Sequence, residues 1–125
     1  MVLRNIKVLT WIYLLILVLG SVLPLNSGTS LNNTYIVEFR SDYLLHFLFM
    51  LPLPVLLGLS LGKKTAPWLR VVVSGLLIVI FCEGIQILIP YRTFNINDML
   101  ANGVGALIGL IPAVFVWRHF SASLN

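Results

Sequence analysis

The chain has 125 residues, of which 59% are hydrophobic and only 10% are charged, and its formal net charge is +4. A soluble domain carries about 25% charged residues, and a core of this size cannot bury so many apolar side chains. The composition therefore excludes an ordinary soluble domain. It predicts one domain over residues 1–125 that crosses a membrane several times.

Four apolar stretches have the length of membrane spans. A bilayer core about 30 Å thick needs about 20 apolar residues per helix, and the predicted spans are Val8–Leu25, Tyr43–Gly62, Val71–Ile89 and Met99–Trp117. Short turns make consecutive spans antiparallel neighbours. The predicted fold class is thus an all-α, up-and-down four-helix membrane bundle. The first span lacks ionisable residues and is expected only to anchor and pack, with Trp11 and Tyr13 at the interface.

The basic residues predict the orientation of this bundle. Only Arg40 and Arg92 fall on the side opposite the termini, whereas six others fall on the side of the termini: Arg4, Lys7, Lys63, Lys64, Arg70 and Arg118. The positive-inside rule then places both termini in the cytoplasm. The basic excess is explained as a topology signal, so no nucleic-acid partner is predicted. Cys82 is the single cysteine, which excludes an intramolecular disulfide and a cysteine-based metal site.

Two segments interrupt the apolar pattern. Residues 26–41 form the longest polar stretch, and the alternation over Tyr35–Arg40 fits either a short strand or a segment lying on the membrane. Pro52 and Pro54 interrupt the second span, where proline kinks a helix. The kink either splays the outer half of this span and opens space beside His46, or is a packing bend without a function.

Most polar residues of the spans fall at the end opposite the termini. Residues three or four apart share a helix face. This spacing joins Asp42 with His46 in the second span, Glu83 with Gln86 in the third, and Asp98 with Asn102 in the fourth, and Arg92 follows the third span. In an antiparallel bundle these ends meet on one side of the membrane, so the residues are predicted to form one polar site.

The fourth span continues the polar line with Gly105 and Gly109. Small residues let membrane helices approach closely, so this face is expected to pack against other helices. Arg92 is the nearest cation, and a bidentate pair with Glu83 or Asp98 would offset the cost of burying either acid. The alternative is that the polar residues only hold the helices together, with Asp98 and Asp42 as N-caps.

Three motifs carry a resemblance to a known family. They are D-Y-L-L-H at Asp42–His46, E-G-I-Q-I-L-I-P-Y-R at Glu83–Arg92 and D-M-L-A-N-G-V-G at Asp98–Gly105. In order and spacing they resemble the VanZ-like membrane proteins, a family named for a protein linked to resistance to the glycopeptide teicoplanin. Tyr43 departs from the family pattern, where a lysine is usual. The resemblance implies a small multi-span protein of the bacterial cytoplasmic membrane that affects the cell envelope or its lipid-linked wall precursors.

Three functions are consistent with these residues. The first is binding of a lipid or lipid-linked envelope component at the outer leaflet, with Asp42, Gln86, Arg92 and Asn102 as ligand-binding residues. The second is a hydrolase or transferase on a lipid-linked substrate, whose catalytic residues would be His46, Glu83 and Asp98. The third is an accessory subunit that docks a partner membrane protein. A glycopeptide is a further possible ligand. No cofactor is predicted, and no metal, because His46, Glu83 and Asp98 lack a known metal-ligand spacing.

Overall fold

The computed structural model describes residues 2–23, 35–36, 39–61 and 68–123. Its long helices are α1 (Val2–Val22), α2 (Ser41–Met50), α3 (Leu53–Leu61), α4 (Trp68–Gly84), α5 (Ile96–Ile108) and α6 (Leu110–Ser123). A 3-10 turn, η2 (Ile85–Leu88), continues α4. The strands β1 (Tyr35–Ile36) and β2 (Phe39–Arg40) form a two-stranded antiparallel ladder. The short strand left open by the sequence is therefore present, and α2 follows it directly.

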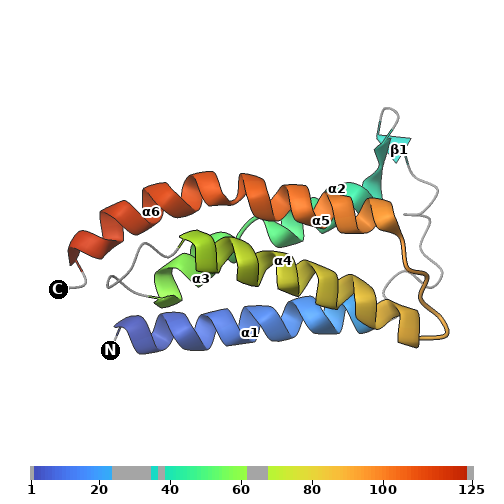
Figure 1. The fold of residues 1–125 in the computed structure, drawn as a ribbon, viewed down its shortest axis with the longest axis horizontal. Coiled ribbons are helices and arrows are strands. Elements are labelled where there is room, and N and C mark those ends of the chain that lie inside the picture. Colours follow the sequence, from blue (N-terminus) through green and yellow to red (C-terminus); the bar gives the residue numbers. More distant parts are fainter. Residues whose placement is uncertain (1, 24–34, 37–38, 62–67, 124–125) are drawn as a thin grey trace.

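These elements make four helices that are long and apolar enough to cross a membrane. They run over Val2–Val22, Asp42–Leu61, Trp68–Leu88 and Ile96–Phe120. The predicted spans are confirmed in number and order, although the first helix begins earlier than Val8 and the fourth begins earlier than Met99. Residues 24–25 and Gly62, where two predicted spans ended, lie outside the described residues. Figure 1 shows that α1 starts and α6 ends at the same end of the molecule, and that the β-ladder lies at the other end.

The second span is broken at Pro52. Helix α2 ends at Met50 and α3 begins at Leu53, because proline lacks the N–H that would continue the ladder. The Tyr13 hydroxyl of α1 donates to the Phe49 carbonyl beside this break. Tyr13 therefore lies near the middle of α1 and stabilises the interruption, and its place in an interfacial belt stays a prediction. Membrane helices tolerate proline where a neighbouring group satisfies the backbone in this way.

The break gives the two halves of the second span different neighbours. Helix α3 packs on α1 and α6, whereas α2 packs chiefly on α5. In its α2 half, which lies on the side of Pro52 away from the termini, the second span therefore separates from α1. Of the two interpretations of the kink that the sequence left open, these contacts favour splaying of the outer half, and the space beside α2 contains the polar residues described below.

Glycine sets the close approach of α5 to α2. A side chain at Gly105 would overlap the Phe47 carbonyl, and one at Gly109 would overlap the Leu51 carbonyl. Phe47 and Leu51 are one turn apart, as are the two glycines, so the backbones meet along a whole turn. The same face of α5 buries Asp98 and Asn102, which confirms that this polar and glycine-lined face is a helix-packing face.

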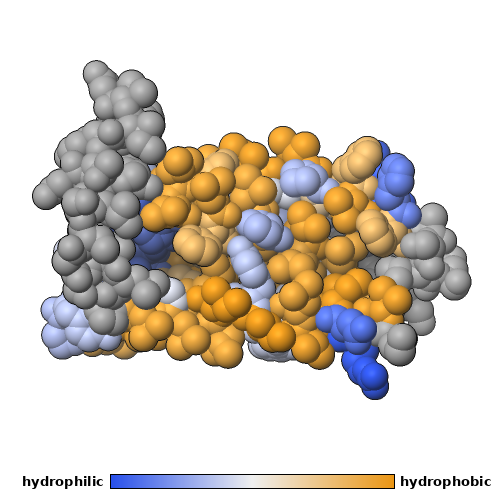
Figure 2. Space-filling view, turned by 180° about the vertical axis from the view of Figure 1, so that it is seen from behind, coloured by the Kyte–Doolittle hydropathy of each residue, from blue (hydrophilic) through white to orange (hydrophobic). Residues whose placement is uncertain are grey.

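The outer surface of the bundle is apolar. Large hydrophobic side chains such as Leu69, Leu77 and Ile111 are each more than half exposed. In Figure 2 hydrophobic residues cover most of the middle of the visible face, with a few weakly hydrophilic residues among them, while the most hydrophilic residues lie toward its two ends. A surface of this kind matches a lipid solvent, so the chain is a multi-pass membrane protein.

Candidate functional site

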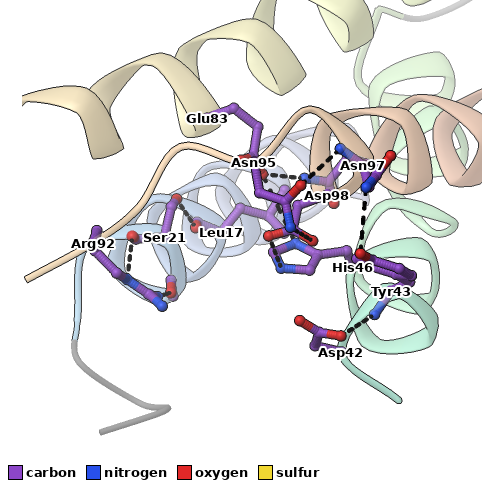
Figure 3. Close-up of polar contacts among 12 residues, drawn as sticks. Leu17, Ser21, Asp42, Tyr43, His46, Glu83, Arg92, Asn95, Asn97 and Asp98 are labelled. Carbon is purple, nitrogen blue, oxygen red and sulfur yellow. Dashed lines mark hydrogen bonds and ion pairs between the residues drawn. The ribbon is translucent and has the colours of Figure 1, made fainter. Parts of the chain in front are cut away.

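His46 is the centre of the polar residues. It stands one turn into α2, and its side chain is 28% exposed. Its Nδ1 atom lies 3.9 Å from Oε1 of Glu83 on α4, and its Nε2 atom lies 3.8 Å from Oδ2 of Asp98 on α5. Figure 3 shows the imidazole ring pointing toward both carboxylates. One histidine therefore faces acids from two other helices, at distances slightly longer than hydrogen bonds.

Glu83 and Asn102 form the buried base of the site. The Asn102 amide donates to Oε1 of Glu83 over 2.6 Å, and the two residues are only 2% and 1% exposed, respectively. Their remaining oxygens, Oε2 of Glu83 and Oδ1 of Asn102, are buried without a hydrogen-bond partner among the described residues. Two adjacent side chains thus each present one unsatisfied acceptor, which is costly in an apolar environment.

Asp98 is held at the start of α5 by Asn95. Asn95 is the N-cap of this helix, because its side-chain oxygen accepts from the Asn97 N–H over 3.0 Å. Its amide also donates to Oδ1 of Asp98 over 3.2 Å. The suggestion that Asp98 is the N-cap is therefore wrong: Asp98 lies two residues inside α5, where its charge still favours the positive helix end.

Asp42 is buried near the start of α2, at 4% exposed. Its Oδ1 accepts from the Tyr43 N–H over 3.1 Å. Because α2 begins at Ser41, Asp42 is inside the first turn and does not occupy the N-cap position. The Tyr43 hydroxyl lies 3.4 Å from the Asn97 amide that donates to it, so the residue that replaces the family's lysine links α2 with α5.

Arg92 does not pair with Glu83 or Asp98. Its Nε and Nη2 atoms donate to the carbonyls of Ser21 and Gly20, over 3.1 and 2.7 Å. These carbonyls belong to the last turn of α1, where acceptors lack partners within the helix and the helix dipole is negative. The expected bidentate ion pair is therefore replaced by an arginine cap on α1, and Figure 3 shows Arg92 and Ser21 together on that side.

A cavity of about 450 Å³ joins most of these residues. Its wall on α1 follows one helix face through Ile16, Leu19, Gly20 and Leu23, and its wall on α2 follows Asp42, Leu45, His46 and Phe49. The rest of the lining consists of Leu17, Ser21, Met50, Cys82, Glu83, Arg92 and Asn102. Several wall residues are substantially exposed, including Leu19 at 43% and Phe49 at 53%. The cavity is thus mostly apolar along its sides, apart from Asp42 and His46, polar at its base, and bordered by lipid-facing residues.

The remaining candidate, Gln86, has a different place. It is 4% exposed and lies in η2, but it does not line the cavity. The structure therefore brings together Asp42, His46, Glu83, Arg92 and Asn102 around the cavity, with Asp98 behind His46.

Sequence reasoning missed the contribution of α1 and of Asn95. The first span supplies a cavity wall and the two carbonyls that hold Arg92. No residue type in that span signals this role, since the backbone provides the carbonyls. Asn95 could have been found, because an Asn three residues before an acid is a common helix-start pattern.

The described residues do not provide a cluster of side chains that could coordinate a metal ion. Over residues 2–23, 35–36, 39–61 and 68–123, no group of three or more His, Cys, Asp or Glu residues is arranged so that it could hold a metal ion. The two ring nitrogens of His46 face different carboxylates, so the three side chains do not converge on one point where an ion could bind.

Comparison with known proteins identifies the family. No curated protein and no solved structure matches the chain. A family model described as VanZ/LLP1 matches residues 8–117, a stretch that holds every site residue named above. The chain belongs to the VanZ/LLP1 family.

Proposed function

We propose that the protein binds a membrane lipid or a lipid-linked envelope component from the outer leaflet of the cytoplasmic membrane. The observation that carries this proposal is the cavity between α1 and α2, with apolar walls and a polar base. Its volume of about 450 Å³ is within the range of small-molecule sites, about 300–1,000 Å³. An apolar chain would lie against Leu19, Leu45 and Phe49, and a polar headgroup would reach the base.

The lipid is expected to enter sideways from the bilayer. The rim residues Ile16, Leu19, Leu45 and Phe49 are all at least 39% exposed and lie on the helices that diverge above Pro52. An occupant could therefore keep its chains in the bilayer while its headgroup enters the protein. Such an arrangement avoids removing the whole apolar chain from lipid.

A photoreactive phospholipid tests this function. We expect a diazirine in its acyl chain to label α1 and α2 at the cavity walls, and Leu45→Trp to reduce that labelling severalfold by filling the cavity. Leu107→Trp is the matched control, because Leu107 is half exposed and does not line the cavity. Equal labelling of all lipid-facing helices, or equal labelling of both variants, would contradict the proposal.

An enzyme at the same place is the second candidate. His46 lies within 4 Å of Glu83 and Asp98, which suits a residue that moves protons between a substrate and a carboxylate. The same reconstituted samples can be searched by mass spectrometry for cleaved or transferred lipid fragments. Turnover that disappears in His46→Ala would favour a hydrolase or transferase, and unchanged lipid masses would favour binding alone.

The family resemblance adds a cellular expectation. The VanZ-like family takes its name from a protein linked to teicoplanin resistance, so the proposed ligand includes lipid-linked wall precursors, and altered glycopeptide susceptibility is a consequence of their binding. Docking of a partner membrane protein is a further role that the exposed apolar helix faces would permit.

A further inference from the structure

The base of the cavity contains two oxygens that receive no hydrogen bond from the described residues. Oε2 of Glu83 and Oδ1 of Asn102 are buried and unpartnered among the described residues, and both side chains line the cavity. Both atoms are acceptors when the glutamate is ionised, and the orientation of Asn102 is set by its donation to Oε1 of Glu83. When Glu83 is ionised, these two oxygens can therefore be satisfied only by a hydrogen-bond donor from outside the two residues.

The neighbouring donors of the cavity lining are directed elsewhere. The Ser21 hydroxyl donates to the Leu17 carbonyl over 2.7 Å. Arg92 donates to two carbonyls of α1. His46 lies 3.9 Å from Oε1 of Glu83, beyond hydrogen-bond distance. An occupant of the cavity is thus the natural source of the missing donors.

A primary ammonium group fits this base best. It carries several N–H donors and no acceptor, so it can satisfy both oxygens at once. Its positive charge would also balance the Glu83 carboxylate, and hydrogen bonds between charged groups are stronger than neutral ones. A hydroxyl group has a single donor, and a quaternary ammonium has none.

Arg92 supplies the complementary charge at another part of the same cavity. Two of its donors are fixed on α1, which holds the guanidinium in one orientation, and the side chain still lines the cavity. Guanidinium has further N–H groups and suits phosphate. The cavity therefore presents an anion on α4, a cation beyond η2, and apolar walls.

We propose that the preferred ligand is a lipid whose headgroup carries a primary ammonium close to a phosphate, as in phosphatidylethanolamine. Glu83 and Asn102 would receive the ammonium, and Arg92 would contact the phosphate. This inference rests on the proposed function, because it specifies the headgroup of the lipid that the cavity takes.

A series of headgroups tests the inference on the wild-type protein. Dioleoyl phosphatidylethanolamine, its mono- and dimethylated forms, phosphatidylcholine and phosphatidylglycerol would be offered to the protein in detergent micelles, with bound lipid measured by native mass spectrometry. Methylation keeps the charge and the phosphate while it removes N–H donors. We expect binding to fall along the series, by about tenfold from phosphatidylethanolamine to phosphatidylcholine, the size of a charge-assisted hydrogen bond.

The outcomes separate the inference from the proposed function. Equal binding of all five lipids, or preference for phosphatidylglycerol, would overturn the ammonium site and leave lipid binding intact. Binding of none would reject the proposed function itself. Soluble glycerophosphoethanolamine is the control for the source of the headgroup: competition as strong as that of the lipid would reject a lipid ligand.

Variants of Glu83 and Arg92 then test which residue recognises which part of the headgroup. We expect Glu83→Gln to reduce the discrimination between phosphatidylethanolamine and phosphatidylcholine severalfold, because the shape is kept and a neutral amide oxygen accepts ammonium N–H groups less strongly than a carboxylate does. Arg92→Gln should weaken every phospholipid alike. Arg70→Gln is the matched control for charge, since Arg70 is exposed near the start of α4, far along this helix from Glu83. Discrimination as large in Glu83→Gln as in the wild type would overturn the assignment.

Discussion

At the scale of single residues, the site depends on which hydrogen bonds orient its acids. Asn95 has two roles at once, because its oxygen caps α5 and its amide holds Asp98. Asp98 in turn faces His46. The orientation of the histidine's partner is therefore tied to the start of a helix, and a change of one side chain can test the two effects separately.

Substitutions of Asn95 separate capping from orientation. We expect Asn95→Ala to lower the free energy of unfolding by about 1 kcal/mol through loss of the cap. Asn95→Ser should retain most of the stability, because serine also caps, but it should release Asp98 from its amide donor. Unfolding in a detergent titration measures both variants. Equal destabilisation of the two would show that the bond to Asp98, not the cap, provides the stability.

The errors at this scale have a physical origin. Helical spacing correctly grouped Asp42 with His46 and Asp98 with Asn102, because periodicity is local. It paired Arg92 with an acid because the acids were the nearest charges in sequence. The carbonyls at the end of α1 competed for that arginine, and their proximity is a tertiary fact. The bond from Tyr13 to Phe49 was missed for the same reason, since the two residues are 36 apart in sequence.

At the scale of elements, α5 approaches α2 closely because two of its contact residues are glycines, which have no side chain. Gly105 and Gly109 lie against backbone carbonyls of α2, which cannot move aside as a flexible side chain would. The sequence predicted the glycine-lined face from its spacing. It did not identify α2 as the partner, because a face pattern does not name the surface that covers it.

Two neighbouring glycines of α5 provide a controlled comparison. We expect Gly105→Ala to destabilise the protein by about 1–3 kcal/mol, because the added methyl group overlaps the Phe47 carbonyl. Gly103→Ala should be neutral or stabilising by up to about 1 kcal/mol, since nothing lies within 4 Å of its added carbon and alanine favours helix. Unfolding titrations of both variants measure the difference, and equal effects would refute the close contact.

At the scale of the whole molecule, charge distinguishes the two ends. Arg4 and Lys7 in the first turns of α1, Arg70 at the start of α4 and Arg118 near the end of α6 lie at the end that contains the termini. Arg92 lies at the other end. Lys63 and Lys64, which were part of the sequence argument, lie outside the described residues. The arrangement of the described cations agrees with the expected bias, and the side of the membrane stays a prediction.

Reporter fusions test this orientation. We expect a periplasmic reporter to be active when fused after Asn33, and a cytoplasmic reporter to be active when fused after Lys64, because the positive-inside rule retains basic segments in the cytoplasm. The opposite pattern would place the cavity on the cytoplasmic side. The proposed ligand would then come from the inner leaflet.

The interruption at Pro52 bears on whether a bound molecule could cross the bilayer through the protein. Every residue that lines the cavity comes from the halves of the helices above the break, and below it α1 closes on α3. Thr10 lies in this lower region, with its hydroxyl 3.3 Å from the Leu56 carbonyl to which it donates. Among the described residues, the recess ends at this contact. If the proposed lipid enters it, the lipid would leave toward the leaflet from which it came, which would be capture on one side of the membrane and not transport through it.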